Sequence, residues 1–105
     1  MQTYKIIVSD LAKSDLHNIV SYLSSAESIA IAKHVERGIL SEMKRLIHFP
    51  EAYPKDEYAT TDTHTIRFII KWRYKILYYI ETDNVYVIGI FHIAQNPKKL
   101  LKYNF

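Results

Sequence analysis

Three residues in the C-terminal half of the chain have side chains that metal-free cleavage of RNA would require. That reaction needs an acid–base group near the ribose hydroxyl and cations that stabilise the charged phosphorus centre. His92 titrates near neutral pH when unperturbed, and Arg67 and Arg73 carry guanidinium groups that suit phosphate. Each also has a plain structural interpretation: a strand-end histidine that holds the next residues by a hydrogen bond, and arginines on a solvated sheet face. For His92 we favour the structural one, because a single histidine in an apolar strand is weak evidence for a site.

The same region is also a candidate contact surface for a large acidic partner. Leu77 and Tyr79 make the outer face of the predicted sheet more apolar than solvent requires, and they alternate with Lys75 in one strand. The candidate contact residues are Arg67, Trp72, Arg73, Lys75, Leu77, Tyr79, Lys98, Lys99 and Lys102. The alternatives are a solvated face, a tryptophan folded back on the sheet edge, and a frayed basic tail.

Composition narrows the chemistry further. The chain has no cysteine, which excludes a disulfide framework and a thiolate nucleophile. The other histidines have no metal-site spacing, and no nucleotide-binding or serine–histidine–acid motif is present. We therefore expect neither a metal nor a cofactor.

The basic charge is concentrated towards the C-terminus. Residues 1–66 hold seven Lys/Arg against nine Asp/Glu, a net of −2, whereas residues 67–105 hold seven against two, a net of +5. Such asymmetry attracts nucleic acid or an acidic protein. No apolar run is long enough to cross a membrane and the start has no signal-peptide layout, so we expect a cytoplasmic protein that forms one domain over residues 1–105.

Two helices are predicted after a short first strand at residues 4–8. Ser9 is a suitable N-cap, and apolar residues then recur at helical spacing up to Leu23. Ser24 and Glu27 form a possible capping box for a second helix, whose apolar stripe continues to Ile47. So short a connection predicts an antiparallel helical hairpin. Gly38 inside the second helix costs roughly 1 kcal/mol of helix propensity, with a close approach of the two helices as one reason.

Three strands follow a polar loop predicted at residues 51–62. Tight connections are expected at Lys71–Trp72 and at Asp83–Asn84, where positive φ is tolerated. Tyr74 and Tyr78 share a face with Ile76 and are predicted to be core. The last strand, residues 85–92, is apolar on both faces, which is typical of a central strand.

These elements give the order β-α-α-β-β-β and an α+β fold. The α-hairpin packs on one face of a mostly antiparallel sheet, and the other face has no predicted covering element. Asn96 and Pro97 predict a short helix in the basic tail.

The order and spacing of these residues resemble the RelE/ParE superfamily of bacterial type II toxins, and its ParE (plasmid-stabilisation) branch most closely. The first helix has the family's alanine, acid–leucine pair, isoleucine and tyrosine; the second ends in its Phe-Pro; the sheet has its Ile-Arg and Tyr-Lys-Ile-Leu-Tyr runs. These positions are Ala12, Asp15, Leu16, Ile19, Tyr22, Phe49–Pro50, Ile66–Arg67 and Tyr74–Tyr78. Two departures stand out: Lys75 replaces the usual arginine, and residues 93–96 replace the arginines that commonly follow the histidine.

The resemblance implies a growth-inhibiting toxin that a cognate antitoxin neutralises. ParE-like members bind DNA gyrase, and RelE-like members are endoribonucleases that cut mRNA on the ribosome. A third hypothesis is a degenerate member that only binds its antitoxin. The weak catalytic set favours gyrase binding. The oligomeric state is left open, with a homodimer as one candidate.

Overall fold

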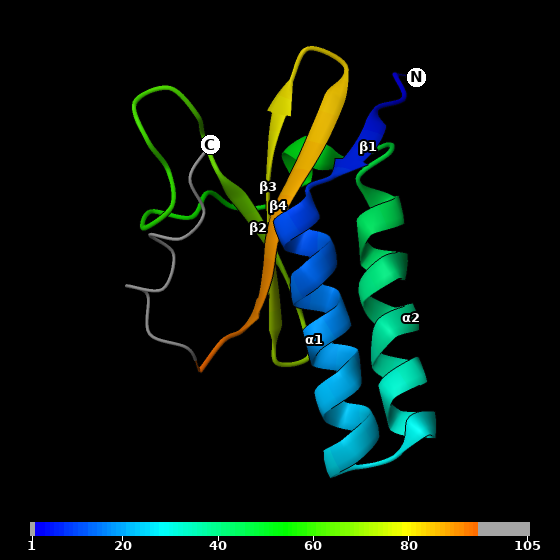
Figure 1. The fold of residues 1–105 in the computed structure, drawn as a ribbon. Coiled ribbons are helices and arrows are strands. Elements are labelled where there is room, and N and C mark those ends of the chain that lie inside the picture. The colour runs from blue at the N-terminus through cyan, green and yellow to red at the C-terminus, as the bar shows by residue number, and fades with distance from the viewer. Residues whose placement is uncertain (1, 95–105) are drawn as a thin grey trace.

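The computed structural model describes residues 2–94. The elements are β1 (Lys5–Val8), α1 (Asp10–Ala26), α2 (Ile29–Arg45), the 3-10 helix η1 (Pro50–Ala52), β2 (Arg67–Lys71), β3 (Tyr74–Glu81) and β4 (Asn84–His92). The predicted α+β order of strand, two helices and three strands is confirmed (Figure 1). The predicted tail helix at Asn96 and Pro97 lies outside the described residues. No helix within residues 2–94 is long and apolar enough to cross a membrane.

The four strands form one sheet in the order β1-β4-β3-β2. β4 is central, as its apolar character predicts, and it pairs parallel with β1 and antiparallel with β3. The turns lie one residue from the predicted positions. They are centred on Trp72–Arg73 and Thr82–Asp83, with positive φ at Trp72 and Thr82.

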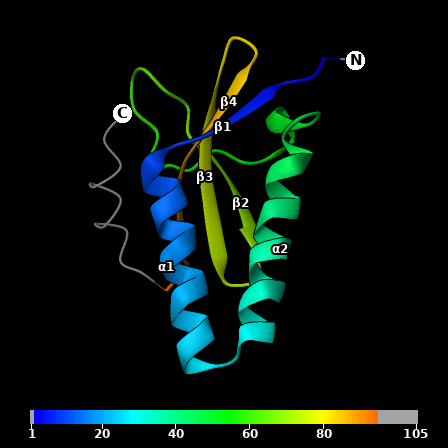
Figure 2. The ribbon, with the colours of Figure 1, turned by 45° about the vertical axis from the view of Figure 1, so that its right-hand side comes forward.

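The two helices form the predicted antiparallel hairpin on one face of the sheet (Figure 2). The Ser9 hydroxyl accepts a hydrogen bond from the Ala12 N–H and caps α1. The predicted capping box is wrong: Ser24 lies inside α1 and donates to the Val20 carbonyl, whereas Ser28 caps α2 by accepting from the Ile31 N–H. Both serines are suitable N-cap residues, although only Ser24 has a glutamate three residues later, and the actual length of α1 makes Ser28 the cap.

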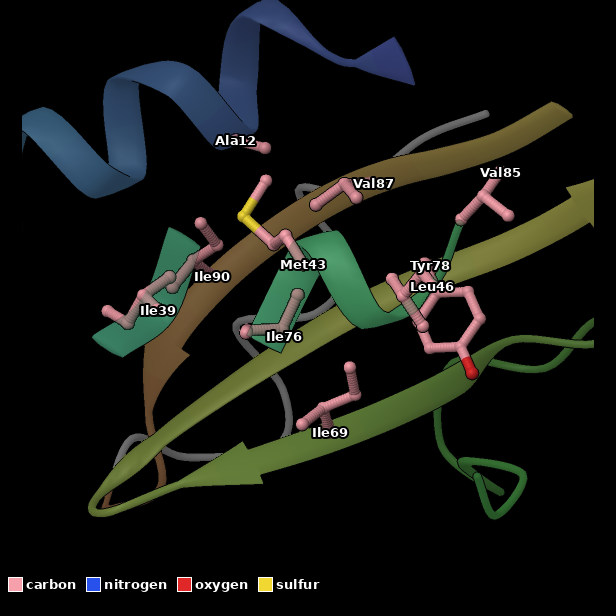
Figure 3. Close-up of a cluster of buried hydrophobic side chains, with 10 residues drawn as sticks. All are labelled: Ala12, Ile39, Met43, Leu46, Ile69, Ile76, Tyr78, Val85, Val87 and Ile90. Carbon is pink, nitrogen blue, oxygen red and sulfur yellow. The ribbon is translucent and has the colours of Figure 1, made fainter. Parts of the chain in front are cut away.

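The main core lies between the helices and the sheet (Figure 3). Tyr78 is fully buried there and Tyr74 packs at its edge, as predicted. The buried members of this core are Ala12, Ile39, Met43, Leu46, Ile69, Ile76, Tyr78, Val85, Val87 and Ile90.

A second core lies on the opposite face of the sheet, for which the sequence predicted no covering element. Ile66, Leu77, Ile88 and Phe91 are buried there, and Ala59 of the loop between η1 and β2 packs against them. This loop lies on the side of the sheet away from the helices (Figure 1).

A bulge in the β3–β4 pairing at Ile88 shifts the alternation of β4, so that Val87 before it and Ile90 after it both face the helices. Ile88 and Phe91 enter the second core. The apolar run of β4 is therefore buried on both faces, because each face of the sheet has a core of its own.

Asp56 holds that loop in place. Its Oδ1 atom accepts hydrogen bonds from the N–H groups of Tyr58 and Ala59 at 2.9 and 3.0 Å. Its Oδ2 atom has no well-aligned hydrogen bond, and its partner is the Lys75 ammonium at 2.6 Å. Lys75 also lies 4.3 Å from the ring centre of Phe68. The ion pair therefore ties the loop to the outer face of β3.

Candidate binding surface

Two of the three candidate catalytic residues come together, and the third does not. The Arg73 carbonyl accepts a hydrogen bond of 2.8 Å from the Ile93 N–H, and His92 pairs with Tyr74 across the sheet. His92 and Arg73 are therefore neighbours at the β2–β3 turn. Arg67 pairs with Tyr78, four residues farther along β3. With a rise of about 3.3 Å per residue and a strand spacing of about 4.8 Å, Arg67 lies roughly 13 Å along the strands and 10 Å across them from His92.

Arg67 is also on the opposite face from the one predicted. It shares its side of β2 with the core residue Ile69, so it faces the helices rather than the outer surface. Its Nη1 atom donates to the Tyr53 carbonyl at 2.7 Å. The alternation in β2 does not say which set of residues faces the helices. Packing against the helices buries Ile69, and Arg67 therefore lies on the same side.

The buried Tyr78 hydroxyl donates to the Pro50 carbonyl beside Arg67. Burial raises the pKa of Tyr78 above its ordinary value of 10.0, and the opposing charge of Arg67 is a smaller effect. Because the folded state holds this proton more tightly than the unfolded chain, the stabilisation is complete below pH 10 and declines as the pH rises above it.

We expect Tyr78→Phe to lower the free energy of unfolding by about 1 kcal/mol at neutral pH, the usual net value of one hydrogen bond. The difference between wild type and variant should narrow above pH 10. Urea titrations followed by Trp72 fluorescence measure both effects. Tyr58→Phe is the matched control, since Tyr58 is 76% exposed, and a gap that widens at alkaline pH would contradict the linkage.

His92 lines a cleft of about 370 Å³ at the end of β4. Its Nδ1 atom accepts a hydrogen bond of 3.1 Å from the Ala94 N–H, the contact expected of a strand-end histidine. The Tyr74 ring meets it edge-on with centroids 5.5 Å apart. Tyr22 and the buried Asp15 also line the cleft, and Asp15 accepts from the Ile90 N–H at 3.0 Å. The sequence did not predict this cleft, because in the sequence its α1 residues show only the spacing of an amphipathic helix.

The predicted outer contact face is largely closed. Leu77 was expected to be exposed and is fully buried under the loop. Lys75 is paired with Asp56. Tyr79 stacks on Tyr86 with ring centroids 5.1 Å apart and meets His64 at 4.4 Å. These three residues thus belong to the internal packing of that face.

Of the predicted contact residues that the structure describes, those of the β2–β3 turn are exposed. Arg73 is exposed, and Trp72 keeps 45% of its surface accessible. The Trp72 ring folds back on α2 rather than on the sheet edge. It lies 4.9 Å from the His34 ring, and a Cβ at Gly38 would overlap it. Gly38 is therefore explained by the approach of this turn, and the predicted approach of the two helices is not its cause.

The three tail lysines, Lys98, Lys99 and Lys102, lie outside the described residues. The candidate binding surface that the structure supports is therefore Trp72, Arg73 and His92 with the adjacent cleft. Within residues 2–94, no three histidine or acidic side chains are grouped so that they could hold a metal ion.

Comparison with known proteins places the chain in a family. Residues 6–97 match the model described as the ParE toxin of the type II toxin–antitoxin system parDE. A solved chain from the "Chromosomal ParDE TA system from P. aeruginosa" has a similar fold, with a TM-score of 0.71 and 11% sequence identity over 87% of this chain and 97% of that one. No curated protein sequence matches the chain. Since the family model spans most of its length, this chain belongs to the ParE toxin family of type II toxin–antitoxin systems.

Proposed function

We propose that this protein arrests bacterial growth by binding DNA gyrase in the cytoplasm, and that a cognate antitoxin neutralises it. The observation that supports binding over RNA cleavage is the dispersal of the candidate catalytic set. Arg67 is held by the Tyr53 carbonyl on the helix side of the sheet, one strand-length away from His92. Residues of the main core, Ile76 and Ile90, lie in the sheet between them.

The contact with gyrase is assigned to the exposed turn. Trp72 has a large exposed ring that is fixed by α2, and Arg73 beside it provides a planar cation. Tryptophan and arginine are the residue types most frequent at the energetic centres of protein interfaces. A rigid turn also loses little conformational entropy on binding.

Endoribonuclease activity is the second candidate. Its support is the position of His92, which lines the cleft at the end of β4, while the backbone of the neighbouring Ile93 is hydrogen-bonded to the Arg73 carbonyl. A histidine and one guanidinium could supply an acid–base group and one phosphate contact.

Two reactions with purified protein separate the candidates. We expect inhibition of gyrase-catalysed supercoiling and intact mRNA in a translation reaction. Arg73→Glu should weaken the inhibition at least tenfold, and the exposed control Lys33→Glu should leave it unchanged. Ribosome-dependent cuts that disappear with His92→Ala would establish the nuclease instead. Absence of both activities, with no effect on growth, would leave only antitoxin binding.

A further inference from the structure

The cleft at the end of β4 contains a buried carboxylate. Asp15 of α1 lines this cleft and is 7% exposed. Its Oδ2 atom accepts the hydrogen bond of 3.0 Å from the Ile90 N–H, which fixes the carboxylate between α1 and β4. A carboxylate that is this deeply buried attracts a cation more strongly than an exposed one, because its surroundings have a lower dielectric constant than water.

Aromatic rings form the walls of the same cleft. The Tyr74 and His92 rings stand at 86° to each other with centroids 5.5 Å apart, so they make two nearly perpendicular walls. Tyr22 of α1 is the third ring, and it is 69% exposed, which places it on the solvent side of the cleft. The faces of aromatic rings carry partial negative charge and attract cations. The walls and the carboxylate therefore favour a ligand of the same sign.

The cleft holds no compensating positive charge. Burial, together with the nearby Tyr22, raises the pKa of the Tyr74 hydroxyl above its ordinary value, so this group stays neutral at neutral pH. The Nδ1 atom of His92 accepts from the Ala94 N–H, and a ring nitrogen that accepts carries no proton. Among the described residues that line the cleft, Asp15 has the only formal charge, and none is lysine or arginine. A phosphate group would meet a carboxylate here, whereas a cation would find a partner.

The shape and chemistry of the cleft suit a guanidinium group better than an ammonium group. A guanidinium is planar and weakly hydrated, so it stacks on an aromatic ring while its N–H groups donate to a carboxylate. An ammonium is a compact and strongly hydrated charge, and it loses more by leaving water. The cleft volume of about 370 Å³ is in the range of small-ligand pockets.

We propose that this cleft binds one guanidinium group, which donates to Asp15 and packs against the tyrosine rings. The group belongs either to an arginine side chain of another protein or to a free small molecule. Such binding goes beyond the proposed function, because the gyrase contact is assigned to the neighbouring Trp72–Arg73 turn.

An NMR titration of the isotope-labelled full chain tests the proposal. The probe is N-acetylarginine amide, and its uncharged counterpart of the same shape is N-acetylcitrulline amide. The arginine derivative should shift the Ile90 amide and the ring signals of Tyr74 and His92 in a saturable manner, and the citrulline derivative should leave them unchanged. The corresponding lysine derivative should bind at least about threefold more weakly. Equal binding of either counterpart would overturn the proposal, as would unchanged signals at the solubility limit of the arginine derivative.

Substitutions locate the bound group. Asp15→Asn removes the charge but keeps an oxygen for the Ile90 N–H, and it should weaken the arginine derivative at least about tenfold. Tyr22→Leu keeps an apolar side chain without a ring and should weaken binding about two- to fivefold. Tyr58→Leu is the matched control, because Tyr58 is a similarly exposed tyrosine outside the cleft, and it should change nothing. Unchanged affinity in either cleft variant would overturn the proposal. Since Tyr22 is exposed, its variant gives this answer even where Asp15→Asn fails to fold.

The same titration distinguishes the two sources of the guanidinium group. A blocked glycine–arginine–glycine peptide should bind at least as tightly as N-acetylarginine amide when the cleft takes an arginine side chain of a protein. Binding of the peptide that is at least tenfold weaker would assign the cleft to a free small guanidine. Inhibition of gyrase, or its absence, changes none of these results.

Discussion

Replacing Asp56 with alanine is expected to lower the free energy of unfolding by about 3–5 kcal/mol, the range for breaking a buried ion pair by removing one partner. Asp56 is 2% exposed and holds the N–H groups of Tyr58 and Ala59 together with the Lys75 ammonium. Without the Asp56 carboxylate, the Lys75 ammonium has lost its ion-pair partner. The loop that covers the second core also loses the hydrogen bonds that hold it in place. Urea unfolding at neutral pH measures the effect.

Two controls separate the ion pair from the loop itself. Asp62→Ala removes an exposed carboxylate from the same loop and should change stability by less than about 0.5 kcal/mol. Asp56→Asn with Lys75→Met removes both charges and should recover part of the loss, because no unpaired charge then remains. A loss of under 1 kcal/mol in Asp56→Ala would show that the loop is held by other contacts.

Gly38→Ala is expected to destabilise the protein by about 1–3 kcal/mol, although alanine favours a helix. The new Cβ would overlap the Trp72 ring, whose turn is fixed at both ends by β2 and β3. The ring must shift, and its contact with His34 is lost. Thermal or urea unfolding gives the size of the effect.

Gly38→Ala should stabilise the protein, rather than destabilise it, when the Trp72 ring is absent. In a Trp72→Ala background, Gly38→Ala removes only helix-breaking glycine and should stabilise by about 1 kcal/mol. A double-mutant cycle over these two positions therefore has a large coupling energy. Equal effects of Gly38→Ala in both backgrounds would show that Trp72 is not the reason for the glycine.

Local patterns predicted most of the fold. Three features depend only on residues close together in the sequence: the apolar stripes of the helices, the Ser9 cap and the apolar run of β4. Each lies where the sequence pattern predicted it. The outer face was mispredicted because its cover depends on Asp56 meeting Lys75, nineteen positions away in the chain. A polar loop with no period gives no sign of such a pairing. The bulge at Ile88 is equally invisible, since an unbroken apolar run fits either face.

The candidate site was harder to predict than the fold. Alternation correctly predicted the core position of Tyr78, yet the same rule put Arg67 on the wrong face, because the choice of face for β2 depends on α2.

The proposed action of this ParE-family protein is to bind gyrase through the Trp72–Arg73 turn. Plasmid topology in cells that express the chain without a neutralising partner tests it most directly. We expect plasmid relaxation soon after induction, undiminished in His92→Ala and lost in Arg73→Glu. Plasmid that stays fully supercoiled while growth stops would contradict it.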